Sequence, residues 1–297
     1  MAATDLEQDL ARRDALGVAE SLVARPAQDD AAARVRLGAM VLHDWFADAE
    51  IRRILRPLFA AAAPDQRALL ALGDIDIWLP DGRAARGWWE QAAAGPDPEL
   101  GAVGAWRAAR ARLRGGRDDE ALRLLEQADA AGIAAASLAL GRTLEWRGDD
   151  EGAADALRRS RTGEGMLRLA EIRLRADDLD GAEHEIARLS PPPRAPGSVD
   201  LHVWEKAVRG EIAFRRGLLE SAEDWLSEVR GAPGDRDRHV ELRLAQIAIA
   251  TGAAVTAYLR LTDLAAGCDA AAEHARLLRT LHRDLLDEGA ARIEQED

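Results

Sequence analysis

The sequence contains no asparagine, one lysine (Lys206) and one cysteine (Cys268) among its 297 residues. A single cysteine cannot form a disulfide within the chain, which fits a protein of a reducing compartment. No apolar run approaches the ~18–20 residues that cross a bilayer. The N-terminus also lacks the basic start and apolar stretch of a secretory signal. We therefore expect a cytoplasmic protein with no membrane insertion.

Positive charge is scarce as well. The chain has 40 lysines and arginines against 53 aspartates and glutamates, which gives a net charge of −13. Surfaces that bind nucleic acid are usually basic, so a nucleic-acid partner is not expected.

The patterns that carry common catalytic and metal chemistry are missing. No two of the six histidines are four residues apart, and there is no Cys-x-x-Cys pair, so a metal site is not expected. A glycine-rich phosphate loop with its lysine and a Gly-x-Ser-x-Gly elbow are also missing. These observations predict a protein that is not an enzyme and needs no cofactor.

The chain is instead rich in alanine, leucine, arginine and glutamate, which favour helices, and these residues follow a repeated pattern. An alanine, here called the anchor, has a small residue twelve positions before it and a large apolar residue four positions after it. A glycine often lies five positions before the anchor, where a turn that needs positive φ is expected. The anchors are Ala85, Ala121, Ala153, Ala182, Ala222 and Ala257.

Two helices of about a dozen residues that meet at a short turn would explain this pattern. The small residue lets the two backbones approach closely, and the large residue fills the space between the helices. One hairpin cannot bury such a face alone, so neighbouring hairpins must stack. The small residues are Gly73, Ala109, Gly141, Ala170, Gly210 and Ala245, and the large ones are Trp89, Leu125, Leu157, Ile186, Leu226 and Leu261.

The pattern resembles the tetratricopeptide repeat. Successive anchors are 36, 32, 29, 40 and 35 residues apart, which brackets the family's period of about 34 residues. The resemblance covers roughly residues 60–265. It implies an all-α fold, a right-handed superhelix of helical hairpins. The turn glycine is replaced by Pro80 and Asp177 in two of the hairpins.

The same pattern divides the chain into five expected parts. Residues 1–59 would form N-terminal helices and a degenerate hairpin, in which Leu37-Gly38 matches Leu72-Gly73. The repeats would be formed by residues 60–189 and 199–268. The proline-rich residues 190–198 would separate the two sets of repeats as a rigid spacer; a hinge or a ligand for a proline-binding domain are the alternatives. Residues 269–297 would form a capping helix and an acidic tail.

The resemblance also implies a binding surface, because the first helix of each repeat lines a concave groove in this family. The groove would be lined at the positions eleven and seven before each anchor, here called position −11 and position −7. Asp74 and Trp78 occupy these positions in the first repeat. Together with tryptophans higher on the same helices, the candidate partner-binding residues are Trp106, Arg110, Arg114, Arg142, Trp146, Arg175, Trp204 and Arg215.

Arginine and tryptophan suit a protein or peptide partner with an acidic or aromatic segment. The chain would then be an interaction scaffold or adaptor. The alternative function is a regulatory receptor whose array senses a small peptide or metabolite and changes conformation. The family's known clamp for a chaperone carboxylate relies on asparagine and lysine, which this sequence nearly lacks, so that clamp is excluded.

A structural interpretation of the same residues stays open. The arginines could pair with neighbours such as Glu145 and Glu171, and Trp106, Trp146 and Trp204 could fill space among small alanines. The adjacent Trp88 and Trp89 point about 100° apart on a helix. Trp89 is expected in the core, whereas Trp88 and its counterpart Trp225 would make repeat-to-repeat packing or a contact on the outer face.

Overall fold

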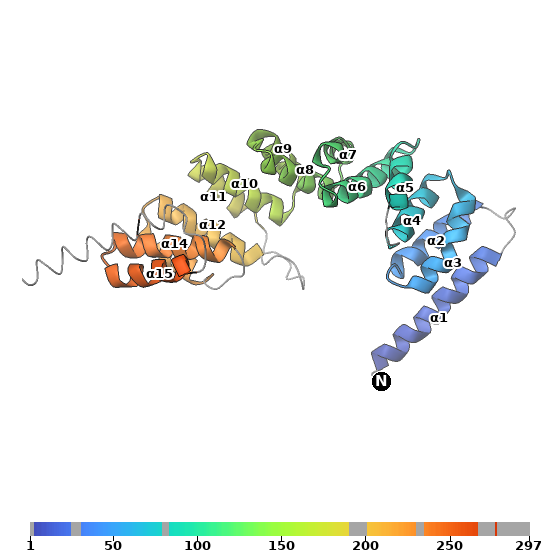
Figure 1. The fold of residues 1–297 in the computed structure, drawn as a ribbon, viewed down its shortest axis with the longest axis horizontal. Coiled ribbons are helices and arrows are strands. Elements are labelled where there is room, and N and C mark those ends of the chain that lie inside the picture. Colours follow the sequence, from blue (N-terminus) through green and yellow to red (C-terminus); the bar gives the residue numbers. More distant parts are fainter. Residues whose placement is uncertain are drawn as a thin grey trace, which may run out of the picture. The chain divides into compact units, whose positions relative to one another are not determined.

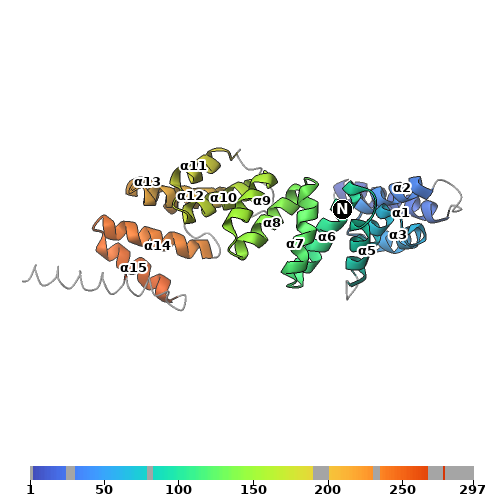
Figure 2. The same ribbon diagram turned by 90° about the horizontal axis from the view of Figure 1, so that it is seen from above.

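The computed structural model describes residues 3–24, 31–78, 83–189, 201–229 and 235–266, together with residue 277. These residues form fifteen helices that follow one another along the chain (Figures 1 and 2). The chain divides into two compact units, residues 1–160 and residues 161–297. Among the helices described, none is both long enough and apolar enough to cross a membrane.

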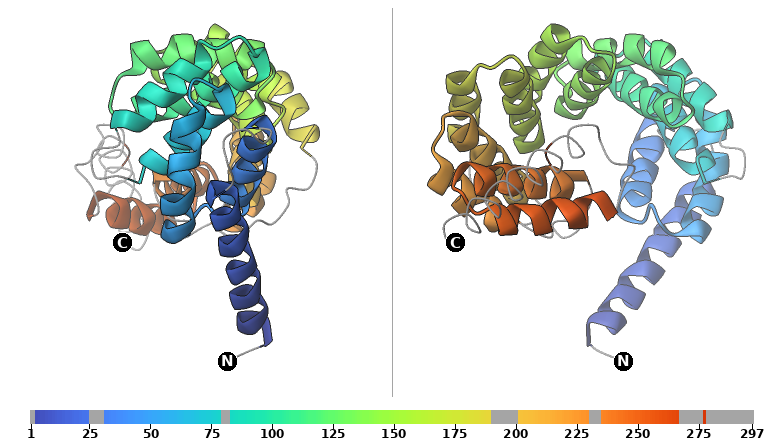
Figure 3. Two further views of the ribbon diagram at one scale, coloured as in Figure 1. Left: turned by 90° about the vertical axis from the view of Figure 1, so that its right-hand side faces the viewer. Right: turned by 60° about the vertical axis from the view of Figure 1, so that its left-hand side comes forward.

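The first unit begins with a helix that packs on α3, followed by four helical hairpins. Figure 3 follows this unit from dark-blue α1 to green α9 in two further views. Helices α2 and α3 contact each other within the N-terminal part of this unit. The helices of this unit are α1 (Ala3–Ala24), α2 (Ala31–Asp44), α3 (Ala49–Ala62), α4 (Gln66–Asp76), α5 (Arg83–Ala93), α6 (Pro98–Arg114), α7 (Asp118–Ala130), α8 (Ala134–Trp146) and α9 (Asp150–Ser160).

The second unit consists of three further hairpins in the part of the chain that is described. Its helices are α10 (Gly163–Arg175), α11 (Leu179–Ala187), α12 (Leu201–Arg215), α13 (Leu219–Ser227), α14 (Asp235–Ala250) and α15 (Ala254–Ala266). The expected spacer at 190–198 lies outside the described residues, and so does the expected capping helix and tail at 269–297, apart from residue 277.

The repeated pattern corresponds to the core of each hairpin. All six anchor alanines are completely buried, and the large residues four positions later are at most 5 % exposed. The small residue faces the large one across the hairpin. A Cβ atom added at Gly141 would lie 2.6 Å from Leu157, and one added at Gly210 would lie 2.6 Å from Leu226. The expected antiparallel hairpins, with close approach at the small residue, are therefore confirmed.

The turns follow the same rule. The four glycines five positions before an anchor have φ between 67° and 79°, a conformation that other residues rarely adopt. Asp177, which replaces glycine in the fourth hairpin, also takes positive φ, at 58°. Aspartate is among the residues that tolerate this region best. Pro80, the other departure, lies outside the described residues.

Candidate functional site

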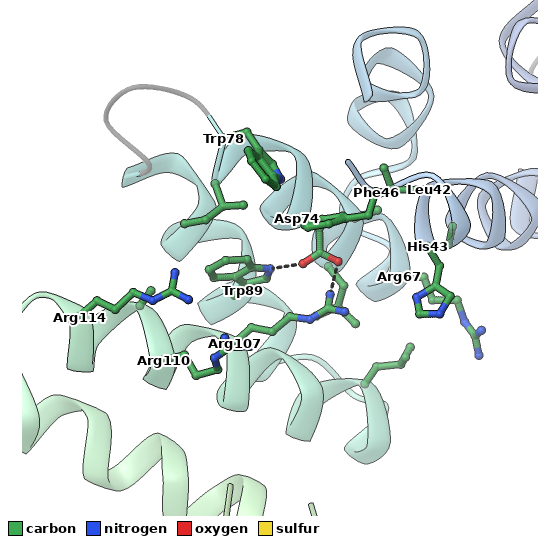
Figure 4. A pocket seen from close by; sticks show the side chains of 16 residues that line it. Leu42, His43, Phe46, Arg67, Asp74, Trp78, Trp89, Arg107, Arg110 and Arg114 are labelled. Atoms are coloured by element: carbon green, nitrogen blue, oxygen red, sulfur yellow. Dashed lines mark hydrogen bonds and ion pairs between the residues drawn. The ribbon is translucent and has the colours of Figure 1, made fainter. Parts of the chain in front are cut away.

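A cavity of about 860 Å³ opens in the first unit, between α2, α4, α5 and α6 (Figure 4). One part of its lining is apolar, and the other carries a single carboxylate among several basic side chains. The apolar residues are Ala39, Leu42, Phe46, Leu70, Ala71, Ile77, Trp78, Trp89, Leu100 and Ala111, and the polar ones are His43, Arg67, Asp74, Arg107, Arg110 and Arg114.

Helix α4 forms the middle of this lining. It starts at Asp65, whose Oδ1 accepts hydrogen bonds from the backbone N–H groups of Arg67 at 2.9 Å and Ala68 at 3.1 Å. An N-cap aspartate satisfies donors that the helix leaves unpaired. Arg67 and Asp74 are seven residues apart, so the two side chains lie on the same face two turns apart. Asp97 caps α6 in the same way, which fixes the helix that carries the arginines.

Asp74 is the acidic group inside the cavity. Its carboxylate forms an ion pair with Arg107 at 2.5 Å and accepts a hydrogen bond from Nε1 of Trp89 at 3.3 Å (Figure 4). Burial is the largest influence on this group and raises the pKa of Asp74 to about 6. The charge of Arg107 and the hydrogen bond from Trp89 act in the opposite direction but do not outweigh burial. Asp74 therefore titrates close to neutral pH.

Three arginines around the cavity have no ion-pair partner among the residues that the structure describes. Arg67, Arg110 and Arg114 are exposed, and no carboxylate in the described part of the chain lies within ion-pair distance of them. Arg110 lies over the ring of Trp106, with 5.5 Å between its Cζ atom and the ring centroid. This local excess of positive charge contrasts with the net charge of −13 of the whole chain.

An exposed aromatic edge borders the cavity next to these arginines. The side chain of Trp78 is 55 % exposed, although it contacts Phe46 edge to face with 5.7 Å between the ring centroids. Arg52 covers the Trp78 ring at 4.6 Å. Aromatic rings held in place but left accessible are typical anchors of binding sites. The cavity thus combines a fixed apolar surface with unpaired guanidinium groups.

Comparisons with known proteins identify the architecture. No family model matches the sequence, and no curated protein matches it. The structure is similar to a crystal structure of the APC/C heterotetramer Cut9–Hcn1, with a TM-score of 0.53 and 14 % identity over 95 % of this chain. The chain spans 57 % of the length of that protein. It is also similar to PilW, a type IV pilus biogenesis factor, with a TM-score of 0.50 and 15 % identity over 69 % of this chain and 97 % of PilW.

The chain has a tetratricopeptide-repeat-like fold. The buried anchors and the similar structures agree on this point, and the identities of 14 % and 15 % limit the likeness to the fold. Among the described residues, no group of three or more histidine, cysteine, aspartate or glutamate side chains is placed to hold a metal ion.

The expected binding residues differ in their exposure and in their contacts. Arg110 and Arg114 both line the cavity, and Trp106 is half-buried beside them. Arg142 is exposed on α8, and Trp146 at the end of that helix is 84 % exposed. These five residues all belong to the first unit.

The expected binding residues of the second unit are mostly engaged within it. Trp204 is only 1 % exposed, and its Nε1 donates a hydrogen bond to Glu171 Oε1 at 2.6 Å. Core packing, the alternative interpretation, therefore describes Trp204. Arg215 pairs with Glu211 at 2.7 Å and donates to the carbonyl of Leu174 at 2.6 Å, which joins α12 to α10. Arg175 is exposed on α10.

Among the polar and aromatic residues that line the cavity, the repeat pattern missed four: His43, Phe46, Arg67 and Arg107. A signal for His43 does exist. If Leu37-Gly38 of α2 is aligned with Leu72-Gly73 of α4, Ala39 and His43 take positions −11 and −7. Phe46 lies in the turn after α2, where the repeat pattern makes no prediction.

The adjacent tryptophans divide as the helix geometry requires. Trp89 is buried, and Trp88 is half-buried with its Nε1 donating to Asp76 at 2.9 Å. Asp76 is completely buried and also accepts hydrogen bonds from Arg56 at 2.8 and 3.1 Å. Trp88 therefore packs between hairpins. Its counterpart Trp225 is half-buried under Arg209, with 5.6 Å between Cζ and the ring centroid.

Proposed function

We propose that the chain is a non-enzymatic interaction module that binds an acidic segment of a partner protein in the cavity of the first unit. The observation that carries this proposal is a group of three exposed arginines, Arg67, Arg110 and Arg114, around an apolar lining. None of them has an ion-pair partner in the described part of the chain. A partner that lacks negative charge would leave these guanidinium groups without a counter-charge in the complex.

The chemistry of the lining favours a carboxylate-bearing peptide. Guanidinium groups form two parallel hydrogen bonds with a carboxylate, which adds geometric specificity to charge attraction. The ring of Trp78 offers a rigid apolar contact in the same cavity as Arg114. Residues of these two types supply most of the binding energy at protein interfaces. The rest of this acidic protein would repel an acidic segment, whereas the positively charged cavity would attract it. Binding of such a segment would therefore be directed to the cavity.

The test is the affinity of fluorescent acidic peptides for the full chain, measured by fluorescence anisotropy. The double variant Arg110→Glu/Arg114→Glu should weaken binding at least tenfold, because both positions would then repel the ligand. The matched control is Arg13→Glu/Arg123→Glu, since both arginines are exposed on α1 and α7 and lie outside the cavity. The control changes the net charge by the same amount and should keep the affinity within about twofold. If both variants lost the same affinity, the change in net charge alone would explain the effect, and the proposed site would be wrong.

A second candidate, a receptor for a small metabolite, is favoured by the size of the cavity. Its volume of about 860 Å³ falls within the range of small-molecule sites, roughly 300–1,000 Å³. The same assay separates the two functions. A dicarboxylate of fewer than ten carbon atoms that displaces the peptides at micromolar concentration, with the same dependence on Arg110 and Arg114, would favour the receptor. A requirement for several peptide residues would favour the interaction module.

A further inference from the structure

Helix α2 carries two large apolar side chains that are exposed. Leu37 is 49 % exposed and Met40 is 60 % exposed. Between them, Gly38 faces α3, because a Cβ atom added there would lie 3.0 Å from Leu58 and 3.3 Å from Phe59. Residues one position before and two positions after Gly38 lie about 100° and 160° from it around a helix. Leu37 and Met40 therefore point away from α3.

The equivalent positions are covered on the first helices of the later hairpins. They lie one residue before and two residues after the small residue of each helix, and every residue there is buried or half-buried. In α4 they are Leu72 and Ile75, which are 1 % and 5 % exposed. In the later first helices they are Ala108 and Ala111, Leu140 and Thr143, Leu169 and Ile172, Arg209 and Ile212, and Leu244 and Ile247.

The preceding hairpin supplies this cover. Leu72 and Ile75 belong to one core cluster with residues of α2 and α3, and Leu244 and Ile247 belong to one with residues of α12 and α13. Successive first helices are also in contact, α2 with α4, α4 with α6, α10 with α12 and α12 with α14. In this chain the two positions thus form a surface on which a neighbouring helix packs.

Helix α1 precedes α2 but does not cover this surface. It runs beside α3 (Figure 1) and contacts α3 more extensively than α2. Arg12 joins α1 to the start of α3 through ion pairs with Asp48 at 2.5 Å and Glu50 at 3.1 Å. The buried residues of α1 share a core cluster with those of α3. Leu37 and Met40 remain exposed as a result.

Opposite charges lie at the two ends of this apolar pair. Arg36 and Asp44 are both exposed, and neither forms an ion pair with another residue of the described part of the chain. Arg36, Met40 and Asp44 follow one another at intervals of four residues, so they lie on one face of the helix. We call Arg36, Leu37, Met40 and Asp44 the α2 face. If two copies of α2 pack antiparallel, Arg36 of each copy lies opposite Asp44 of the other.

We propose that the α2 face is a dimer interface, on which α2 of a second copy packs antiparallel about a two-fold axis near Met40. The second copy supplies the helix that a preceding hairpin supplies elsewhere in the chain. Leu37 and Met40 of both copies form the apolar centre, and Arg36 of each copy pairs with Asp44 of the other. The same patch is used on both copies, as two-fold symmetry requires.

The interface is small and separate from the proposed peptide site. One helix from each copy buries little area compared with the roughly 1,200–2,000 Å² of a standard interface, so a dissociation constant in the micromolar range is expected. None of the four residues of the α2 face lines the cavity. The dimer can therefore be tested without reference to peptide binding.

Sedimentation velocity of the full chain between about 1 and 100 µM tests for the dimer. The sedimentation coefficient should rise with concentration, and Leu37→Glu/Met40→Glu should raise the dissociation constant at least tenfold. Both side chains are exposed in the monomer, so this variant should keep the circular dichroism of the wild type. The matched control is Val255→Glu/Leu259→Glu, at exposed apolar residues of α15, which should dimerise like the wild type.

Two results would overturn the proposal. A wild-type chain that stays monomeric throughout this range would leave the α2 face to a helix of another protein. A control variant that loses as much affinity as Leu37→Glu/Met40→Glu would place the interface elsewhere.

The antiparallel arrangement is tested by a charge exchange. Arg36→Glu and Asp44→Arg should each weaken dimerisation about fivefold or more, because like charges then meet at both ends of the interface. An equal mixture of the two variants should form dimers with the wild-type affinity, because the mixed dimer has an attractive pair at each end. Arg123→Glu, at an exposed residue of α7, controls for net charge and should dimerise normally. Unchanged dimerisation in both single variants, or a mixture that stays monomeric, would refute this packing of α2.

Discussion

Gly73 and Trp89 face each other so closely that no side chain fits between them. A Cβ atom added at Gly73 would lie 2.2 Å from Nε1 of Trp89, whose side chain is 5 % exposed. The contact joins α4 to α5 at the start of the regular repeats, and the same ring donates a hydrogen bond to Asp74 inside the cavity. One ring therefore sets the spacing of the first regular hairpin and positions a cavity side chain.

The first prediction concerns this contact. Gly73→Ala should destabilise the first unit by about 1–3 kcal/mol, because a methyl group forces the Trp89 ring or the α4 backbone to move. Urea unfolding followed by circular dichroism measures the change. The control is Gly87→Ala in α5, where an added Cβ meets no atom within 4 Å. That change should stabilise the helix by up to about 1 kcal/mol, and a loss of stability there would contradict this account of the hairpin.

The second prediction concerns Trp204, which the sequence also allowed as a binding residue. Trp204→Ala should cost about 3–5 kcal/mol, because it removes a large buried side chain. Trp204→Phe keeps most of the apolar contact but loses the hydrogen bond to Glu171, so about 1–2 kcal/mol is expected. Trp146→Ala serves as the exposed comparison and should change stability by less than about 0.5 kcal/mol. A stable Trp204→Ala variant would place that side chain outside the core.

The third prediction concerns Glu211, a buried carboxylate of the second unit. Burial alone would raise the pKa of Glu211. Hydrogen bonds from His239, Arg243 and Arg215 outweigh burial and hold the pKa of Glu211 far below the usual range. The ionised group therefore stabilises the folded state above the pKa of the unfolded chain, near 4.3, and this stabilisation is lost as the pH falls below that value.

Glu211→Gln should accordingly lower the free energy of unfolding by roughly 2–4 kcal/mol at pH 7. The difference between the wild type and the variant should shrink between pH 5 and pH 3, as the wild type loses this contribution. Urea unfolding at several pH values measures it. Glu220→Gln, at an exposed residue of α13, should show no pH-dependent difference. A constant gap for Glu211→Gln from pH 7 to pH 3 would contradict the prediction.

The fourth prediction concerns the pH dependence of binding in the cavity. With the pKa of Asp74 raised to about 6, lowering the pH from 7 to 5.5 protonates this carboxylate and removes the counter-charge of Arg107. An acidic peptide should then bind about three- to tenfold more tightly, as expected for about 1 kcal/mol of charge interaction.

Asp74→Asn should bind tightly at both pH values and lose this dependence. His43 also lines the cavity, so both proteins are compared in a His43→Gln background, which leaves Asp74 as the variable group. Anisotropy titrations at pH 7 and 5.5 supply the measurement. An unchanged pH dependence in Asp74→Asn would show that another group is responsible.

Much of the fold followed from local spacing in the sequence. The anchors Ala85 and Ala257 stand at opposite ends of the array, and both are completely buried. Their burial was predictable because a small residue, a turn and a large residue at fixed distances define one hairpin, whatever lies beyond it. The positive φ of Asp177 followed from the same spacing, since the position, more than the residue type, requires it.

The cavity was less predictable, because its properties arise between helices. Trp204 and Trp146 were both candidate binding residues in the sequence, yet one is buried and the other exposed, since burial depends on the helices that pack over each position. The pairing of Asp74 with Arg107 joins α4 to α6 over 33 positions of sequence, and Phe46 reaches the cavity from a turn. No repeat position specifies either contact.

The small residues and the candidate binding residues are immediate neighbours in the chain. Gly73 precedes Asp74, and Gly141 precedes Arg142. Each glycine lies against a large residue of its partner helix, whereas Asp74 lines the cavity and Arg142 is exposed. The position that determines the packing of the hairpin and the position that is a candidate for binding are therefore different residues, although they are adjacent in the chain. A side chain added at Gly141 would displace Leu157, whereas a change at Arg142 alters an exposed side chain, so a substitution at the second position leaves the packing of the hairpin intact.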